Sequence, residues 1–192
     1  MSKDQLTGII LSGGKSSRMG EEKGLVDFLG KPLISYAIDV LQPIADPIII
    51  GANHELETYR KFGYRIIEDE IKEIGPIGGL LSTIKISETE QNFILSCDMP
   101  FLNADIMTYL LQNMHYADVV VAMHRDNKIE PLCGIYSRKI IPEIEAAIEK
   151  GRYKLLDLFS KVHFKAIKID ASLPFYSDQL FYNINRPDDI MP

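Results

Sequence analysis

Leu6-Thr-Gly-Ile-Ile-Leu11 runs directly into Ser12-Gly-Gly-Lys-Ser-Ser-Arg-Met-Gly-Glu-Glu-Lys23, so an apolar segment is followed by a loop rich in glycine and serine. An apolar run without polar alternation predicts a strand buried on both faces, as in a parallel sheet. The loop would then leave the carboxyl end of that strand, where open parallel sheets bind their ligands. We therefore expect the functional groups to gather at one edge of a sheet.

Short β-branched runs alternate with helix-period stretches along the rest of the chain. We expect strands at Leu6–Leu11, Ile48–Ile50, Arg65–Glu68, Phe93–Cys97, Val119–Met123, Leu132–Tyr136 and Phe164–Ile169. We expect helices opened by Pro32, by Asn53 and by the turn Gly75–Gly79, and further helices at Ile106–Met114, Ile140–Lys150 and Lys154–Phe159. This alternation predicts an α/β fold, in which a mainly parallel sheet is covered by helices on both faces. A single domain is expected over residues 1–192.

Composition excludes several classes of protein. The 192 residues are 46% apolar and 25% charged, which is typical of a globular chain and not of a disordered one. The net charge of −6 argues against broad nucleic-acid binding. No apolar run approaches the ~20 residues of a membrane helix, and no secretory pattern is visible at the N-terminus. Cys97 and Cys133 form no CxxC pair, so a structural zinc cluster has no support. With neither a secretory nor a membrane segment visible, we expect a cytoplasmic protein with reduced thiols and no membrane partner.

The loop after the first expected strand has the chemistry of a phosphate site. Gly13 and Gly14 allow the backbone to approach a ligand closely, and successive N–H groups can form an anion nest. Lys15, Arg18 and Lys23 concentrate positive charge in an acidic chain. The Walker A and GxGxxG spacings are both absent. A flexible loop with incidental basic residues is the alternative, but the position of the loop after the strand favours phosphate binding.

A carboxylate follows the fourth expected strand, at Cys97-Asp98-Met99-Pro100. A nucleotide on the glycine loop would need Mg²⁺ to offset its charge, and Mg²⁺ prefers one or two carboxylates together with phosphate oxygens and water. Asp98 is therefore the candidate metal ligand. Taken alone, an aspartate at this position is more often a cap of the following segment.

Four motifs and a closing segment carry a resemblance to a known family. They are Leu11-Ser-Gly-Gly-x-Ser-x-Arg18-Met-Gly-x-x-Lys23, Gly75-Pro-Ile-x-Gly79-Leu, Cys97-Asp98-Met-Pro100, Pro131-Leu-x-Gly134-x-Tyr136 and Asn183-Ile-Asn185-Arg-Pro187. In this order and spacing the set resembles the molybdenum cofactor guanylyltransferases of the MobA type. The resemblance covers nearly the whole chain. The first motif alone would define only the wider nucleotidyltransferase superfamily.

The resemblance implies a three-layer, Rossmann-like nucleotidyltransferase fold and a reaction. GMP would be transferred from GTP to the terminal phosphate of molybdopterin carrying molybdenum, and pyrophosphate would be released. Mg²⁺ is the implied cofactor, and contact with enzymes that make or accept the cofactor is expected to be transient. One departure is Glu22, where the motif usually has aspartate.

The resemblance also assigns site residues by position. It places the nucleotide on Leu11, Ser12, Gly13, Lys23, Asn53, Asp69 and Asp98, with Asp98 as the metal ligand, and the pterin side on Asn183 and Asn185. To the nucleotide-binding set we add Gly14 and Gly78, whose backbone a ligand can approach closely. The catalytic set is Arg18, Lys23 and Asp98, in which we add Arg18 because its guanidinium would neutralise the leaving pyrophosphate.

Several of these positions have plainer explanations. Asn53 could be a helix cap, and Asp69 sits in an acidic run that is more often a solvated turn. Gly75–Gly79 could be only a tight turn, although its glycines would let a base lie flat on the backbone. Asn183 and Asn185 precede a proline, so a turn explains them equally well.

A phosphate oxygen is already a usable nucleophile, so we expect no covalent intermediate and a mechanism of positioning and charge stabilisation. The scattered histidines and the absence of a GxSxG elbow agree with this expectation. The alternatives are a molybdopterin cytidylyltransferase, a sugar-1-phosphate nucleotidyltransferase, and a non-catalytic nucleotide-binding module that delivers cofactor. Such a module would not need both Lys23 and Asp98, so their presence favours an enzyme.

Overall fold

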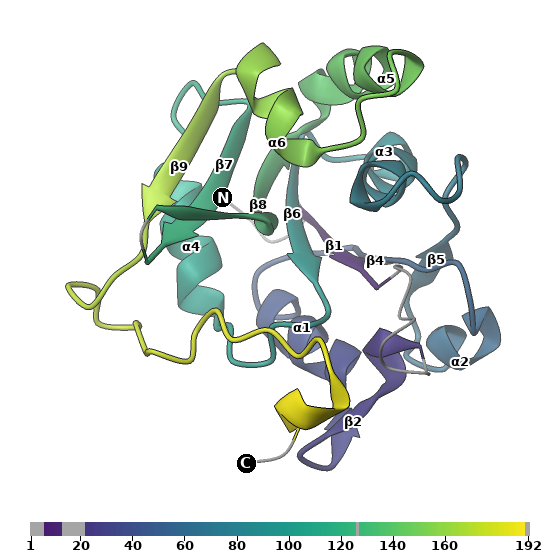
Figure 1. Ribbon diagram of the computed structural model, residues 1–192, viewed down its shortest axis with the longest axis vertical. Helices are drawn as coiled ribbons and strands as arrows, with labels where there is room; N and C mark the ends of the chain where they lie inside the picture. The colour runs from purple at the N-terminus through teal and green to yellow at the C-terminus, as the bar shows by residue number, and fades with distance from the viewer. Residues whose placement is uncertain (1–5, 13–21, 126, 191–192) are drawn as a thin grey trace.

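A computed structural model describes residues 6–12, 22–125 and 127–190 of the chain. Figure 1 shows a twisted sheet with helices on both sides. The main strands are β1 (Leu6–Leu11), β4 (Ile48–Gly51), β5 (Arg65–Ile67), β6 (Gln91–Ser96), β7 (Val119–His124), β8 (Lys128–Ser137) and β9 (Phe164–Lys168). The α-helices are α1 (Leu33–Leu41), α2 (Leu56–Arg60), α3 (Pro76–Ile86), α4 (Ala104–Gln112), α5 (Ile141–Glu149) and α6 (Leu155–Leu158). Short 3₁₀ helices are η2 (Lys23–Leu25), η3 (Arg138–Ile140), η4 (Phe159–Lys161) and η5 (Pro187–Ile190).

The sheet is mainly parallel, which confirms the expectation from the sequence. Its seven strands lie in the order β5-β4-β1-β6-β8-β7-β9. The pairs β5–β4, β4–β1, β1–β6 and β7–β9 are parallel, whereas β8 runs antiparallel to both of its neighbours. The predicted first strand coincides with β1 at both ends. The carboxyl ends of β5, β4, β1 and β6 therefore meet at one edge of the sheet.

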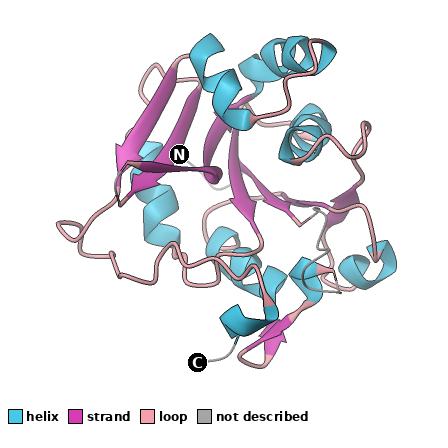
Figure 2. Cartoon of the chain, in the orientation of Figure 1, coloured by secondary structure: helices cyan, strands magenta, loops and turns pink. Residues whose placement is uncertain are grey.

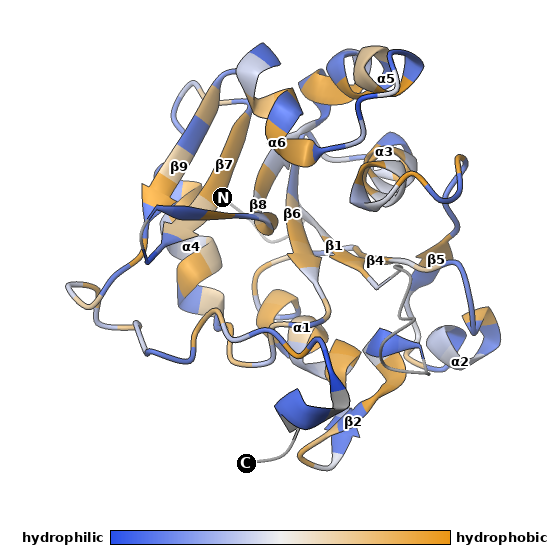
Figure 3. Cartoon of the chain, viewed as in Figure 1, coloured by the Kyte–Doolittle hydropathy of each residue, from blue (hydrophilic) through white to orange (hydrophobic). Residues whose placement is uncertain are grey.

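Alternate residues of β1 face two different helix layers. Ile9 and Leu11 pack in one core with side chains of α3, α5 and α6. Ile10 packs in the other core with α1 and α4. Because successive side chains of a strand point to opposite faces, both faces of β1 must be apolar. Figure 2 shows the resulting three layers. Figure 3 shows mostly apolar residues on β7 and on the C-terminal part of β6, whereas a strand with one face in solvent would alternate apolar and polar residues.

Local structure departs from the sequence expectations in several places. The strand expected at Leu132–Tyr136 is longer, at Lys128–Ser137, and the helix expected at Ile106–Met114 begins and ends two residues earlier. The predicted helix cap at Asn53 is wrong, because α2 begins at Leu56 with Glu55 in the capping position. Gly78 and Gly79 are not in a turn before the helix, since α3 already begins at Pro76, whose fixed φ suits a first helical turn. A two-stranded hairpin, β2 (Asp27–Phe28) with β3 (Lys31–Pro32), was not expected. Strands of two residues leave too little periodicity to be read from the sequence.

No helix in the described part of the chain is long and apolar enough to cross a membrane.

Candidate active site

Lys23, Asp98 and Asn185 converge at the edge where the parallel strands end. The Lys23 Nζ donates to Asp98 Oδ2 at 2.6 Å and to Asn185 Oδ1 at 2.7 Å. The side chains of Lys23 and Asp98 are only 19% and 17% exposed. The Ser96 hydroxyl, at the last position of β6, contacts the other Asp98 oxygen. The structure therefore joins three of the sequence-predicted site residues into one polar cluster, which we call the Lys23 cluster.

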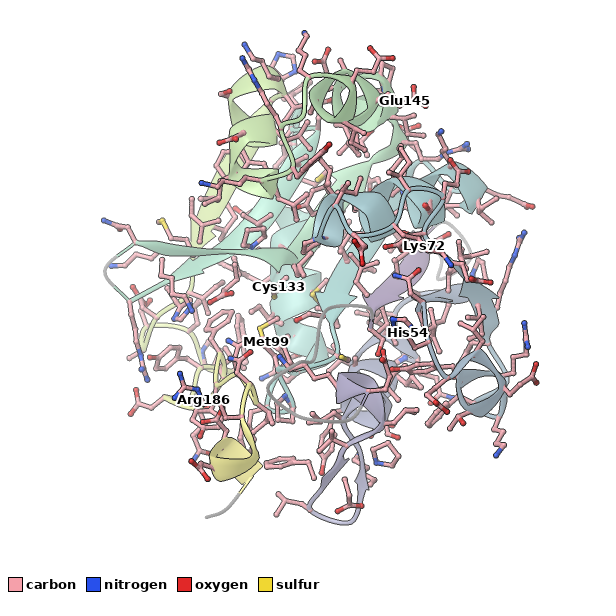
Figure 4. All side chains as sticks on the ribbon, turned by 45° about the vertical axis from the view of Figure 1, so that its right-hand side comes forward. His54, Lys72, Met99, Cys133, Glu145 and Arg186 are labelled. Atoms are coloured by element: carbon pink, nitrogen blue, oxygen red, sulfur yellow. The ribbon has the colours of Figure 1, made fainter. Side chains whose placement is uncertain are left out.

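The backbone places each member of the Lys23 cluster. Lys23 begins η2, and Asp98 lies two residues beyond the end of β6. The C-terminal segment is tied to the same point, because the Ile184 N–H donates to the Asp98 carbonyl at 2.9 Å. The Ile184 side chain is fully buried in a small core with Val26, Phe28 and Leu33. Figure 4 shows Met99 and Arg186, the neighbours of Asp98 and Asn185, on the same side of the molecule.

Tyr59 links the two described residues that flank the glycine loop. Its hydroxyl lies 2.6 Å from Ser12 Oγ and donates to Glu22 Oε1 at 3.3 Å. Since the phenol has one proton, Ser12 must donate to the phenol oxygen. Gly24 completes this packing, because a Cβ there would lie 2.0 Å from Ser12 Oγ and 2.5 Å from the Tyr59 hydroxyl. Sequence reasoning missed Tyr59 and Gly24, and only the glycine directly after Lys23 offered a signal.

We expect Tyr59→Phe to lower the free energy of unfolding by about 1–3 kcal/mol, because the substitution leaves the buried Ser12 hydroxyl without its acceptor. Urea unfolding of the variant and the wild type measures the difference. Tyr116→Phe is the matched control, since Tyr116 is fully exposed at 101% and its hydroxyl loss should cost almost nothing. Equal stability of Tyr59→Phe and wild type would show that the tyrosine bridge contributes nothing.

Burial raises the pKa of the Glu22 carboxyl above its ordinary value of 4.5, although His54 and the Tyr59 hydroxyl oppose the shift. The folded state therefore binds this proton more tightly than the unfolded state. The stability that depends on the proton is complete below the unfolded pKa and is lost as the pH rises through the folded pKa. We expect Glu22→Gln to be more stable than wild type at neutral pH, and the difference should shrink as the pH falls towards 4.5. Denaturant unfolding at several pH values tests this, with exposed Glu149→Gln as the control, and a difference that does not change with pH would contradict it.

Asn53 and Asp69 form a second polar pair, across β4 and β5. Asn53 Nδ2 donates to Asp69 Oδ2 at 2.9 Å, and the Asp69 N–H donates to Asn53 Oδ1 at 3.0 Å. Asp69 is thus half-buried and held by a partner, where the sequence alone favoured a solvated turn. Burial raises the pKa of its carboxyl, while Asn53 lowers it. A Cβ on Gly79 would lie 3.2 Å from Asp69 Oδ1, so the glycine keeps that oxygen accessible beside α3.

Gly78 has a packing role in the structure. A Cβ at this position would lie 2.7 Å from the Ile71 carbonyl oxygen, so only glycine lets the loop before α3 approach the helix. The assignment of Gly78 to nucleotide binding stays a prediction. Leu11 is buried in the core beneath the site, and Ser12 is buried at the end of β1. The predicted residues Gly13, Gly14 and Arg18 lie outside the described residues.

A cavity of about 420 Å³ opens beside the Lys23 cluster. Asp98, Ser96 and Asn183 line it on the polar side. The charged Glu130 and Lys154 also line it, the remaining lining is apolar, and Tyr153 and Leu156 remain 43% and 53% exposed. Asn183 is therefore at the cavity and Asn185 at the Lys23 cluster, so the two asparagines face different groups.

The cysteine next to Asp98 is not set up as a nucleophile. Cys97 is 4% exposed, and burial, with the nearby Asp98 charge, raises its pKa to about 12. A thiol nucleophile must be deprotonated near neutral pH. The geometry therefore agrees with the expectation that no covalent cysteine intermediate forms.

Residues 8–164 match the family model of the MobA-like NTP transferase domain. The chain belongs to this family. A probable molybdenum cofactor guanylyltransferase of Flavobacterium johnsoniae is 39% identical over 188 residues, which cover 97% of this chain and 95% of the relative. A probable molybdenum cofactor guanylyltransferase of Pyrococcus horikoshii is 34% identical over 191 residues, which cover 97% of each chain. The resemblance expected from the motifs is confirmed.

A solved structure shares the fold of this MobA-like NTP transferase. It is the molybdopterin-guanine dinucleotide biosynthesis protein A from Archaeoglobus fulgidus, with a TM-score of 0.81 and 24% identity, and the match covers 96% of this chain and 94% of that one. The predicted nucleotidyltransferase fold is therefore confirmed. Family membership also makes the chain a nucleotidyltransferase, as expected from its paired Lys23 and Asp98.

Proposed function

We propose that this MobA-like NTP transferase moves GMP from GTP to the terminal phosphate of molybdenum-bearing molybdopterin and releases pyrophosphate. The observation that carries the proposal is the Lys23 cluster, which lies between the Asn53–Asp69 pair and the cavity lined by Asn183. A donor nucleotide and an acceptor phosphate could thus meet at one lysine and one carboxylate. The guanylyltransferase names of the relatives support the choice of donor and acceptor.

The nucleotide side is assigned to the ends of β1, β4 and β5. The glycine loop is assigned to the phosphates, and Lys23 with Arg18 is assigned to the charge that develops on the leaving pyrophosphate. Ser12 holds the start of that loop, since its N–H donates to the Gly51 carbonyl at 2.9 Å and its hydroxyl lies 2.6 Å from the Tyr59 hydroxyl. Asp69 is assigned to accept from the N–H groups of the base, while Asn53 holds Asp69 in place through one hydrogen bond to its carboxylate and one from its backbone N–H. This arrangement performs the reaction by positioning and electrostatics, so it needs no protein nucleophile.

Asp98 is the proposed ligand of Mg²⁺. No three His, Cys, Asp or Glu side chains of the described residues gather into a metal site. A single carboxylate at the nucleotide edge suits Mg²⁺, which takes most of its ligands from phosphates and water. When bound, the ion supplies charge neutralisation between the donor and acceptor phosphates. With Asp98 holding the ion, the Lys23 ammonium would be available to contact a phosphate oxygen.

Nucleotide binding is tested by thermal unfolding with GTP, CTP or ATP, each with and without Mg²⁺. A ligand that binds only the folded state at ~100 Kd adds about 2.7 kcal/mol of stability, so GTP with Mg²⁺ should raise the Tm by several degrees. A smaller shift without Mg²⁺ is expected. A shift with CTP alone would make the chain a cytidylyltransferase, and no shift with any nucleotide would refute the proposal.

Cytoplasmic location and transient contact with enzymes of cofactor synthesis stay predictions. They would be tested by fractionation and by crosslinking in cells that make the cofactor.

A further inference from the structure

The cavity beside Asp98 has a partly apolar lining that suits a flat heterocycle. Pro131, Leu132 and Leu155 give it apolar walls, next to the charged Asp98, Glu130 and Lys154. Tyr153 and Leu156, which also line it, expose 43% and 53% of their surface, so they leave apolar surface that a ligand could cover. A planar ring between these residues would remove apolar surface from water on both of its faces.

Two charged side chains that line this cavity, Glu130 and Lys154, have no part in the chemistry described so far, and Glu130 is the acidic one. Glu130, on β8, lines the cavity, and its side chain is only 13% exposed. His124 Nε2 lies 2.9 Å from Glu130 Oε1, and Lys128 Nζ lies 2.6 Å from the same oxygen. Both contacts fall on Oε1, so among the described residues no hydrogen bond is recorded to Oε2. The Oε2 atom of this carboxylate can therefore still accept hydrogen bonds from a ligand.

The support for Glu130 is itself rigid. His124 is 7% exposed and stacks on Phe181, with the ring centroids 4.1 Å apart and the planes 15° from parallel. The Phe181 carbonyl accepts from Asn183 Nδ2 at 3.1 Å. Glu130 and Asn183, which both line the cavity, are therefore connected through two aromatic rings. A side chain fixed in this way suits recognition of a ligand more than a passing surface contact.

We infer that Glu130 recognises the amino-oxo pyrimidine edge of the pterin, in the acceptor site of the proposed function. That edge carries an amino group beside a ring N–H, two adjacent donors that a carboxylate can accept together. The apolar walls then hold the ring system, and the phosphate of the acceptor reaches towards Asp98 and Lys23. This inference rests on the proposed acceptor, and guanine carries the same donor edge, so the test must separate the two.

The test uses neopterin monophosphate, a fluorescent pterin with a terminal phosphate, and the matching lumazine, in which a carbonyl replaces the amino group. Fluorescence anisotropy measures binding of each probe to the wild type, to Glu130→Gln and to Glu130→Asp. We expect Glu130→Gln to bind the pterin about 10–100-fold more weakly, because a charged hydrogen-bond acceptor is lost. Its relative affinity for the lumazine should rise, since an amide offers a donor to the new carbonyl. Glu130→Asp keeps a carboxylate and should still prefer the pterin.

Controls separate the inference from the proposed function. Exposed Glu88→Gln should bind both probes as the wild type does. The GTP thermal shift and GMP transfer to the natural acceptor are measured on the same preparations. The inference is wrong if Glu130→Gln still prefers the pterin to the lumazine, or if the variant binds GTP more weakly but the pterin as tightly as wild type. Neither result would contradict the proposed GMP transfer. Failure of the wild type to bind either probe also overturns the inference, whereas absence of transfer in the wild type refutes the proposed function.

Discussion

Lys23→Ala is expected to slow GMP transfer by about 10²–10³-fold under single-turnover conditions with saturating GTP, Mg²⁺ and acceptor. The ammonium balances charge that appears on the leaving pyrophosphate, so it acts more strongly in the transition state than in the ground state. Loss of one such contact costs about 3–4 kcal/mol of barrier by analogy with a lost oxyanion donor. Rapid-quench measurement of product against time gives the rate.

The matched control for this variant is Lys31→Ala. Lys31 also pairs with an aspartate, Asp39, but its side chain is 38% exposed and lies in the β2–β3 hairpin, outside the Lys23 cluster. Its removal should leave the transfer rate unchanged. If Lys23→Ala retains a near-normal rate while folded, the assignment of the ammonium to the phosphates is wrong.

Asp98→Asn is expected to reduce the single-turnover rate to a similar extent and to raise the Mg²⁺ concentration needed for half of the maximal rate. The substitution preserves shape but removes the charge that we assign to the metal. A Mg²⁺ titration of wild type and variant at saturating GTP separates the two effects. Asp39→Asn, at an exposed aspartate that also pairs with a lysine, should keep the wild-type titration curve.

An unchanged Mg²⁺ dependence in Asp98→Asn would mean that Asp98 serves only as the partner of Lys23. Thermal unfolding of the variant without ligands separates this outcome from a loss of structure. The contact with Lys23 is retained in part, because the amide oxygen of asparagine can still accept from the ammonium.

The fold was predictable where the signal is local and repeated. The unbroken apolar run Leu6–Leu11 suits a strand between two helix layers. It therefore predicted both a parallel sheet and the first and last residues of β1. The stripe on α1 likewise follows directly from helical spacing. Asn53 failed as a cap because a tertiary partner, Asp69, engages its side chain. Local propensity does not contain such partners.

The candidate site was predictable in part, for the same reason. Lys23 and Asp98 stand beside strand ends, where any parallel sheet gathers its ligand groups. The contact of Lys23 with Asp98, and that of Lys23 with Asn185, depend on how η2, the end of β6 and the C-terminal segment pack together. Tyr59 lies in no motif, and Glu130 directly precedes the Pro131–Tyr136 motif without belonging to it. Their roles arise from side chains that meet only in the folded protein.

GMP transfer itself gives the most direct test of the account. The purified chain is incubated with molybdenum-bearing molybdopterin, Mg²⁺ and either GTP or CTP labelled at the α-phosphate, and the label and pyrophosphate are followed together. The account predicts label from GTP in a guanine dinucleotide, with pyrophosphate released in equal amount and little transfer from CTP. Label that stays in GTP, or that enters a dinucleotide only from CTP, would contradict it.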